Sequence, residues 1–231
     1  MAKAADANET AGGTPKRRNR KDDVVRAAVD VFWRKGYAGS SVQDVADSVG
    51  VLKGSLYYYI QSKEDLLFQI VQDVHEQSRS ILDEVVELDV GPLERLRSYI
   101  ERHVAWYLQN VEEVTVYFRD WRYLTGERLE QAIANRHSYE GIIRDLIVQA
   151  QDHGDVDPGV DPKYASFYVL AAVNHVPDWY RRGGRDTPAR IAAIYADLTV
   201  GTLVGTRARP PARDTARQRS GAAPRRRRKA A

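Results

Sequence analysis

Apolar side chains recur every three or four residues along most of this chain, and that spacing is the strongest constraint on its fold. The first such set follows the i, i+3, i+4, i+7 pattern of one helix face: Val25, Ala28, Val29 and Phe32. No stretch of convincing length alternates apolar and polar residues, as a half-buried β-strand would. The chain is therefore expected to be all-α, with about nine helices.

Residues that start and stop helices divide this pattern into segments. Gly36 and Gly50 each offer a stop after an apolar stripe. Ser41 and Ser62 each precede an acidic residue by three positions, which is the pattern of a capping box at a helix start. A short helix is expected at about residues 53–59. Three prolines stand just inside later helix starts, where a missing N–H costs nothing: Pro92, Pro162 and Pro188.

Charge is distributed unevenly along the 231 residues. The two ends, 1–21 and 207–231, carry 16 basic and 3 acidic residues, whereas the body carries 19 basic and 29 acidic ones. Neither end has apolar spacing, so we expect a disordered basic arm over 1–20 and a disordered basic tail over 207–231. Between them we expect a small domain over 21–66 and a larger one over 67–206. Basic ends of this kind contact nucleic acid or remain solvated tails.

Several functional classes find no support in the sequence. The chain has no cysteine, so it has no disulfide, thiolate metal site or cysteine nucleophile. Its five histidines lack metal-ligand spacing, and no nucleophile-elbow or glycine-rich nucleotide motif occurs. We therefore expect no enzyme activity, no metal and no cofactor. No apolar run approaches the ~18 residues of a membrane span, and no signal-peptide pattern is visible, so we expect a cytoplasmic protein without a membrane partner.

Residues 41–59 have the spacing of a helix-turn-helix, in which one helix ends at a glycine and a short helix follows at once. Such a unit places its second helix in the major groove of DNA. The consecutive tyrosines Tyr57 to Tyr59 would fan over roughly 200° of helix surface, so at least one ring must face water or a partner. Lys53 can donate hydrogen bonds outward while Leu56 anchors the helix inward. On spacing alone, a half-buried wall or a protein interface remains an alternative.

Four motifs between residues 22 and 67 carry a family resemblance: "FWRKGY", "VADSVGV", "KGSLYYYI" and "SKEDLL". Together they resemble the DNA-binding domain of the tetracycline-repressor (TetR) family. The resemblance implies a small DNA-binding domain joined to a larger helical domain that dimerises and holds an inducer. By position it implies base contacts from Gln43, Lys53, Gly54 and Tyr57. It implies phosphate contacts from Ser41, Ser55, Tyr58 and Lys63.

The stretch "VLAAVNHVPDWYRRGGRDTPARIAAIYADLTVGTL" is similar to the last two helices of a TetR branch tied to lipid catabolism. That branch often responds to acyl-CoA thioesters, so the resemblance implies an acyl-CoA inducer near Asn174 and Trp179. Seven aromatic residues are further candidates for a pocket wall, or for an ordinary core: Trp106, Tyr107, Tyr117, Phe118, Trp121, Tyr123 and Tyr139. Arg119 and Arg122 could meet a phosphate or carboxylate of a ligand, or pair with nearby acids.

The last two helices are expected to form a homodimer interface, since two copies of such a pair make a four-helix bundle. The candidate interface residues lie on their apolar faces: Phe167, Ala171, Ile191, Tyr195 and Leu198. The sequence thus favours a homodimeric repressor of a palindromic operator, nucleoid-associated when bound and released by a small apolar inducer. Two alternatives stay open. One is an efflux regulator that senses aromatic or cationic drugs, and the other is a DNA-packaging protein that reads no sequence.

Overall fold

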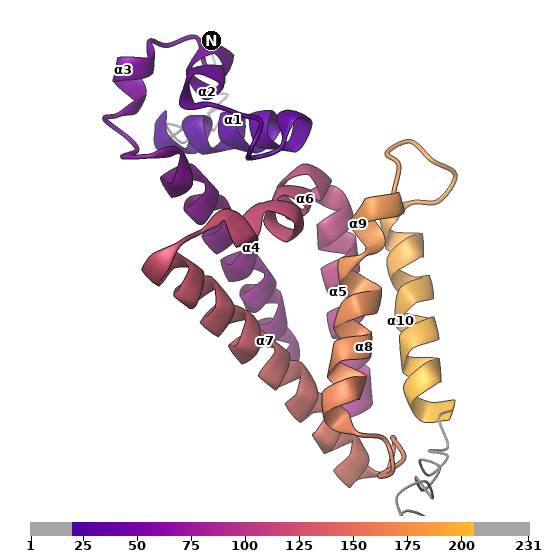
Figure 1. Ribbon diagram of the computed structural model, residues 1–231. Coiled ribbons are helices and arrows are strands. Elements are labelled where there is room, and N and C mark those ends of the chain that lie inside the picture. Colours follow the sequence, from indigo (N-terminus) through magenta and orange to yellow (C-terminus); the bar gives the residue numbers. More distant parts are fainter. Residues whose placement is uncertain (1–19, 206–231) are drawn as a thin grey trace, which may run out of the picture.

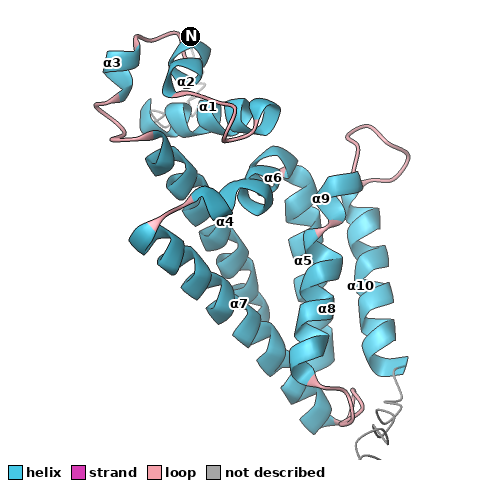
Figure 2. Ribbon diagram, viewed as in Figure 1, coloured by secondary structure: helices cyan, strands magenta, loops and turns pink. Residues whose placement is uncertain are grey.

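The computed structural model describes residues 20–205, and within that range every regular element is a helix (Figure 1; Figure 2). The elements are α1 (Arg20–Lys35), α2 (Val42–Ser48), α3 (Lys53–Leu56), α4 (Lys63–Val86), α5 (Pro92–Gln109), α6 (Val111–Asp120), the 3-10 turn η1 (Trp121–Tyr123), α7 (Gly126–His153), α8 (Pro162–Asn174), α9 (Val176–Trp179) and α10 (Pro188–Gly205). The expected all-α class is confirmed. The expected basic arm and tail lie outside the described residues, except for Arg20.

The helix starts follow from local chemistry. The Ser41 hydroxyl accepts a hydrogen bond from the backbone N–H of Asp44, and the Asp44 carboxylate accepts one from the Ser41 N–H. Ser62 and Asp65 form the same capping box before α4. After α1, Gly36 has a φ of +74°, a left-handed conformation that glycine adopts without strain. The serine and glycine signals therefore mark helix ends as the sequence predicts.

Two hydrophobic clusters form the interior, and α4 contributes to both. Its first half buries Ile70 against α1 and α2, in a cluster that also includes residues of α6 and α7. Its second half buries Leu82 and Val85 in a cluster shared with α5, α7, α8 and α10. Figure 1 shows α4 running from the small unit of α1–α3 into the larger helical unit. The boundary that we expected between residues 66 and 67 thus falls inside a continuous helix.

The larger unit is built around α5. The last helix, α10, packs along α5, and α7 packs against both α5 and α8. Figure 1 shows α8 and α10 side by side at one edge of the molecule. No helix between Arg20 and Gly205 is both long and apolar enough to cross a membrane.

Candidate nucleic-acid interface and ligand cavity

The recognition helix is shorter than expected, because α3 ends at Leu56 and the next three residues form a turn. The backbone N–H groups of Tyr59 and Ile60 both donate to the Leu56 carbonyl oxygen, over 2.8 and 3.1 Å. Leu56 and Ile60 are 0% and 6% exposed, so they fix both ends of this turn in the core. The turn between the two anchors is consequently pushed outward.

All three tyrosines of this turn are exposed, which confirms that at least one ring faces solvent. The exposed fractions are 49% for Tyr57, 89% for Tyr58 and 40% for Tyr59. Lys53 and Gly54 are also exposed, and a Cβ built on Gly54 would meet no atom within 4 Å. Packing within the chain therefore does not require glycine at this position, and its lack of a side chain leaves the start of α3 open to a close partner.

Ser55 on α3 is partly buried, and three other predicted DNA contacts are engaged within the chain. The Ser41 hydroxyl caps α2, and the side-chain amide of Gln43 donates to Asp47 over 2.7 Å. Lys63 Nζ donates to the carbonyl oxygens of Tyr37 and Ser40, over 2.7 and 2.8 Å. Burial lowers the pKa of Lys63. An ammonium has three donors, so Lys63 retains one N–H for a phosphate while it holds the 36–40 turn.

A small cavity of about 50 Å³ lies in the larger unit, between α4, α5, α6, α7 and α8. Five of the predicted ligand residues line it, namely Tyr107, Tyr117, Phe118, Tyr139 and Asn174. The sequence did not point to the remaining lining residues: His75, Ser78, Arg136 and Leu170. The volume is far below the ~300–1,000 Å³ of a ligand pocket, so a whole ligand requires the surrounding helices to move apart.

Arg136 is the one guanidinium or ammonium among the described residues that line this cavity. Its Nη1 donates to the Tyr117 hydroxyl over 3.2 Å, and its guanidinium carbon lies 5.8 Å and 4.8 Å from the ring centroids of Tyr117 and Trp121. A sequence signal for this residue exists, because Arg136, Tyr139 and Ile143 follow i, i+3, i+7 spacing on α7 and the last two are buried. The arginine therefore belongs to the inward face.

A buried polar network adjoins the cavity. The Tyr139 hydroxyl lies 3.0 Å from His103 Nδ1 and donates to the Tyr99 hydroxyl over 3.3 Å. His103 is 0% exposed, and burial lowers its pKa to about 3. The imidazole is therefore neutral near pH 7 and acts as a fixed hydrogen-bonding partner for Tyr139.

The remaining predicted ligand residues lie outside the cavity. Trp106 packs against both hydrophobic clusters, and Trp179 is an exposed ring stacked on Tyr195 with centroids 6.0 Å apart. Trp179 lines a separate surface cleft of about 320 Å³. The guanidinium of Arg122 is exposed and lies over the Trp121 ring, 4.9 Å from its centroid. These aromatic and basic side chains shared helical spacing with the cavity residues, which is why the sequence could not separate them.

Arg119 joins the two units instead of facing the cavity. Its Nη2 donates to the Phe32 carbonyl oxygen over 2.5 Å, and its Nε donates to Asp120 over 3.0 Å. Asp120 is 2% exposed and also accepts a hydrogen bond from the Tyr37 backbone N–H, over 3.3 Å. The pairing with an acid that the sequence left open thus occurs, and it lies at the contact between α6 and α1.

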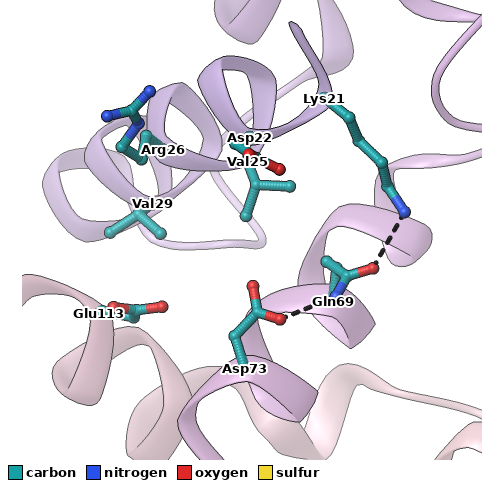
Figure 3. Close-up of a pocket in the computed structure, with 8 residues that line it drawn as sticks. All are labelled: Lys21, Asp22, Val25, Arg26, Val29, Gln69, Asp73 and Glu113. Atoms are coloured by element: carbon teal, nitrogen blue, oxygen red, sulfur yellow. Dashed lines mark hydrogen bonds between the residues drawn. The ribbon is translucent and has the colours of Figure 1, made fainter. Parts of the chain in front are cut away.

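A larger cleft of about 610 Å³ lies on the surface where α1, α4 and α6 meet (Figure 3). Val25 and Val29 of α1 line one side, and Asp73 of α4 and Glu113 of α6 line the other. The Gln69 side-chain amide donates to Asp73 over 2.8 Å. Burial, and then the charge of Asp73, raise the pKa of Glu113. None of the predicted site residues lines this cleft, which forms the seam between the small and the larger unit.

The expected dimer residues divide between surface and core. Phe167 and Leu198 are 47% and 64% exposed, Ala171 is exposed, and Tyr195 is partly buried. Ile191 is instead only 7% exposed and belongs to the core of the larger unit. It is therefore not available on an open face, because α10 turns this side toward α5. Within residues 20–205, no group of three or more His, Asp or Glu side chains could hold a metal ion.

The helix-turn-helix and the cavity-bearing helical unit together define a class, that of ligand-responsive DNA-binding regulators. Two family models match the chain. "Bacterial regulatory proteins, tetR family" covers residues 24–70, and "Tetracyclin repressor-like, C-terminal domain" covers residues 89–203. The chain therefore belongs to the TetR family of bacterial transcriptional regulators, as the sequence motifs indicate.

Relatives in this family align over most of the chain. The HTH-type transcriptional repressor KstR2 of Mycobacterium tuberculosis is 22% identical over 186 residues, covering 80% of this chain and 93% of KstR2. The crystal structure of PfmR from Thermus thermophilus matches with a TM-score of 0.72 at 27% identity, covering 77% of this chain and 97% of PfmR. AibR in complex with isovaleryl coenzyme A and operator DNA matches with a TM-score of 0.72 at 28% identity, covering 80% and 98%. These relatives are transcriptional regulators, not enzymes.

Proposed function

We propose that this chain is a homodimeric repressor that binds a palindromic operator through α3 of each protomer and is released by an acyl-CoA thioester. The observation that carries DNA binding is the outward turn of Tyr57, Tyr58 and Tyr59 between two buried anchors. Exposed rings at this place can contact thymine methyl groups or donate to phosphates. Lys21 of α1 lines the same surface cleft as the three tyrosines, so its positive charge lies on the side of the molecule that carries them.

Dimerisation is supported by the exposed apolar side chains along α8 and α10. They occur on the faces of the two helices that lie at one edge of the molecule: Tyr164, Phe167, Tyr168, Ile194, Leu198 and Val204. An apolar face of this size on neighbouring helices favours pairing with its own copy around a two-fold axis. A two-fold dimer matches a palindrome whose half-sites lie about 34–36 Å apart.

An acyl-CoA inducer is supported by the likeness to AibR, whose structure contains isovaleryl coenzyme A and operator DNA. In this chain, Tyr117 and Phe118 line the cavity and the next two residues, Arg119 and Asp120, hold α1 and the turn at Tyr37. A ligand that widens the cavity would displace α6, and α6 carries this displacement to the small unit. The spacing of the two α3 helices would then no longer match the operator.

Two measurements test this function. Selection of random duplexes by the purified full chain should enrich a palindrome that binds two chains. Titration of this complex with acyl-CoA thioesters should release the protein at concentrations where free coenzyme A does not. Enrichment of no sequence, with equal affinity for operator and bulk DNA, would favour the packaging alternative instead.

The drug-sensing alternative finds less support in the cavity. The described residues of the cavity lining include Arg136 and no Asp or Glu, so a cationic drug would meet a like charge there and no carboxylate. Cationic dyes should therefore release the operator less effectively than anionic ligands of the same size. Release by the dyes alone would reverse this preference.

A further inference from the structure

Arg136 brings a positive charge and spare hydrogen-bond donors to the cavity. A guanidinium has five N–H donors and no acceptor. Arg136 donates one hydrogen bond to the Tyr117 hydroxyl, and its guanidinium lies over the rings of Tyr117 and Trp121. No carboxylate within residues 20–205 forms an ion pair with it. The half-buried positive charge of Arg136 is thus left without an anion in the described part of the chain.

The neighbouring polar groups do not supply a negative charge. The Tyr107 hydroxyl donates to Asn174 Oδ1 over 3.4 Å, so the amide oxygen is occupied while the amide N–H₂ remains a donor. The Tyr139 hydroxyl is bonded to His103 and Tyr99. The Tyr117 hydroxyl accepts from Arg136 and keeps its own proton. The lining also includes His75 and Ser78, which can accept as well as donate, but it includes no carboxylate, so the described lining offers no negative charge to Arg136.

We propose that the inserted end of the ligand is a carboxylate, which pairs with Arg136 and accepts further hydrogen bonds from Tyr117 and Asn174. This inference rests on the proposed function, because it specifies the chemistry of that same ligand. A carboxylate accepts two parallel hydrogen bonds from a guanidinium, and such pairs are among the strongest in proteins. About 50 Å³ is room for a small terminal group, not for a long alkyl chain. The carboxylate comes from a free organic acid or from the far end of a dicarboxylic monothioester.

The same pairing reaches the DNA-binding unit. Arg136 contacts Tyr117 on α6 and Trp121 on η1, which flank Arg119 and Asp120. A carboxylate that draws the guanidinium toward itself weakens its contacts with Tyr117 and Trp121. The segment that holds α1 is then freed to shift, so Arg136 determines both which ligand binds and whether binding is transmitted.

Thermal shift measurements on the full chain test this inference with five probes: hexanoate, adipate, dimethyl adipate, glutaryl-CoA and isovaleryl-CoA. A carboxylate-ended probe present at about 100 times its Kd should raise the Tm of the wild type by roughly 5 °C or more. The shift should disappear in Arg136→Met and partly survive in Arg136→Lys. Arg144→Met, the same change on the same helix outside the cavity, should respond as the wild type does.

The probes separate the two sources of the carboxylate. A shift with hexanoate or adipate identifies a free acid, and a shift with glutaryl-CoA alone identifies a monothioester. The inference is overturned when no carboxylate-ended probe raises the Tm more than its counterpart without a free carboxylate, which is dimethyl adipate or isovaleryl-CoA. It is also overturned when Arg136→Met shows the same shift as the wild type. Operator release by isovaleryl-CoA independent of Arg136 would overturn only this inference. Failure to select a palindrome would count against the proposed function and not against the carboxylate.

Discussion

Arg119 on α6 donates a hydrogen bond from Nη2 to the carbonyl oxygen of Phe32 on α1, over 2.5 Å. Its Nη1 also donates to the carbonyl oxygen of Trp33, over 3.3 Å. The Phe32 carbonyl oxygen also accepts from the Gly36 backbone N–H over 2.8 Å, and the helix dipole at this end of α1 favours a cation. One side chain of the larger unit therefore caps the first helix of the DNA-binding unit.

Removing this cap should weaken the junction between the units. Arg119→Ala leaves Asp120, which is 2% exposed, without its cation and deprives two α1 carbonyls of a donor. We expect a loss of about 1–3 kcal/mol in the free energy of unfolding. Urea unfolding should show it, with Arg122→Ala on the exposed neighbour as the control. Equal effects of the two variants would mean that the cap contributes nothing.

Loss of the most exposed tyrosine should affect DNA and not the fold. Tyr58 is 89% exposed, so Tyr58→Ala should leave the Tm unchanged while weakening operator binding by about 1–3 kcal/mol, or roughly 5- to 150-fold. Fluorescence anisotropy with a labelled operator measures this change. Tyr58→Phe shows whether the ring or the hydroxyl is responsible.

The matched core variant behaves in the opposite way. Leu56 is 0% exposed, so Leu56→Ala should lower stability by about 2–5 kcal/mol. A fall in Tm for Tyr58→Ala with unchanged operator affinity would make the ring a packing residue and would contradict its assignment to the DNA interface.

Several of these features are legible in the sequence because they arise from local chemistry. The capping boxes at Ser41 and Ser62 need only a serine and an aspartate three positions later. The end of α3 is different, since it depends on Ile60 reaching the core, a tertiary contact that no local pattern specifies. The sequence therefore predicts the helix-turn-helix and its buried Leu56, but it gives the recognition helix three residues too many.

The ligand cavity was predicted less well for the same physical reason. Tyr117 and Arg119 stand two positions apart on α6, yet one lines the cavity and the other caps α1. Along α10, apolar residues occur on every side, so the pattern cannot distinguish the buried Ile191 from Ile194, which is 42% exposed. Periodicity reports the inward side of an amphipathic helix, and it carries little information where a helix has two apolar sides.

Charge on the exposed face of α10 should prevent dimerisation. Leu198 is 64% exposed, and Leu198→Asp would place an unpaired carboxylate in the proposed interface. We expect dimerisation to weaken by at least about 2 kcal/mol, which raises the dissociation constant roughly 30-fold. Sedimentation equilibrium measures this dissociation constant. The control is Ile133→Asp, at an exposed position of α7. A Leu198→Asp dimer of unchanged affinity would place the interface elsewhere.

Acid should destabilise the fold through His103. Burial lowers its pKa from 6.5 to about 3, so below pH 6.5 the unfolded chain binds a proton that the folded chain does not. The free energy of unfolding should therefore decrease by up to about 1.4 kcal/mol for each unit by which the pH is lowered from pH 6.5 to pH 3. Urea titrations at pH 7, 6 and 5 should show a shallower fall for His103→Phe. His137→Gln, at an exposed position, should keep the wild-type slope.

Because α4 is continuous through both hydrophobic clusters, it also fixes the angle by which the DNA-binding unit is rotated relative to the larger unit. Each residue in a helix adds a rise of about 1.5 Å and a turn of about 100°. Inserting one residue into the middle of α4 would swing the tyrosine turn by roughly a quarter of a revolution relative to α10, even if every local contact re-formed. Seven inserted residues would nearly restore the angle, because they complete about two turns, but they would lengthen α4 by roughly 10 Å. The length of α4 is therefore as much a determinant of operator geometry as any side chain that touches DNA.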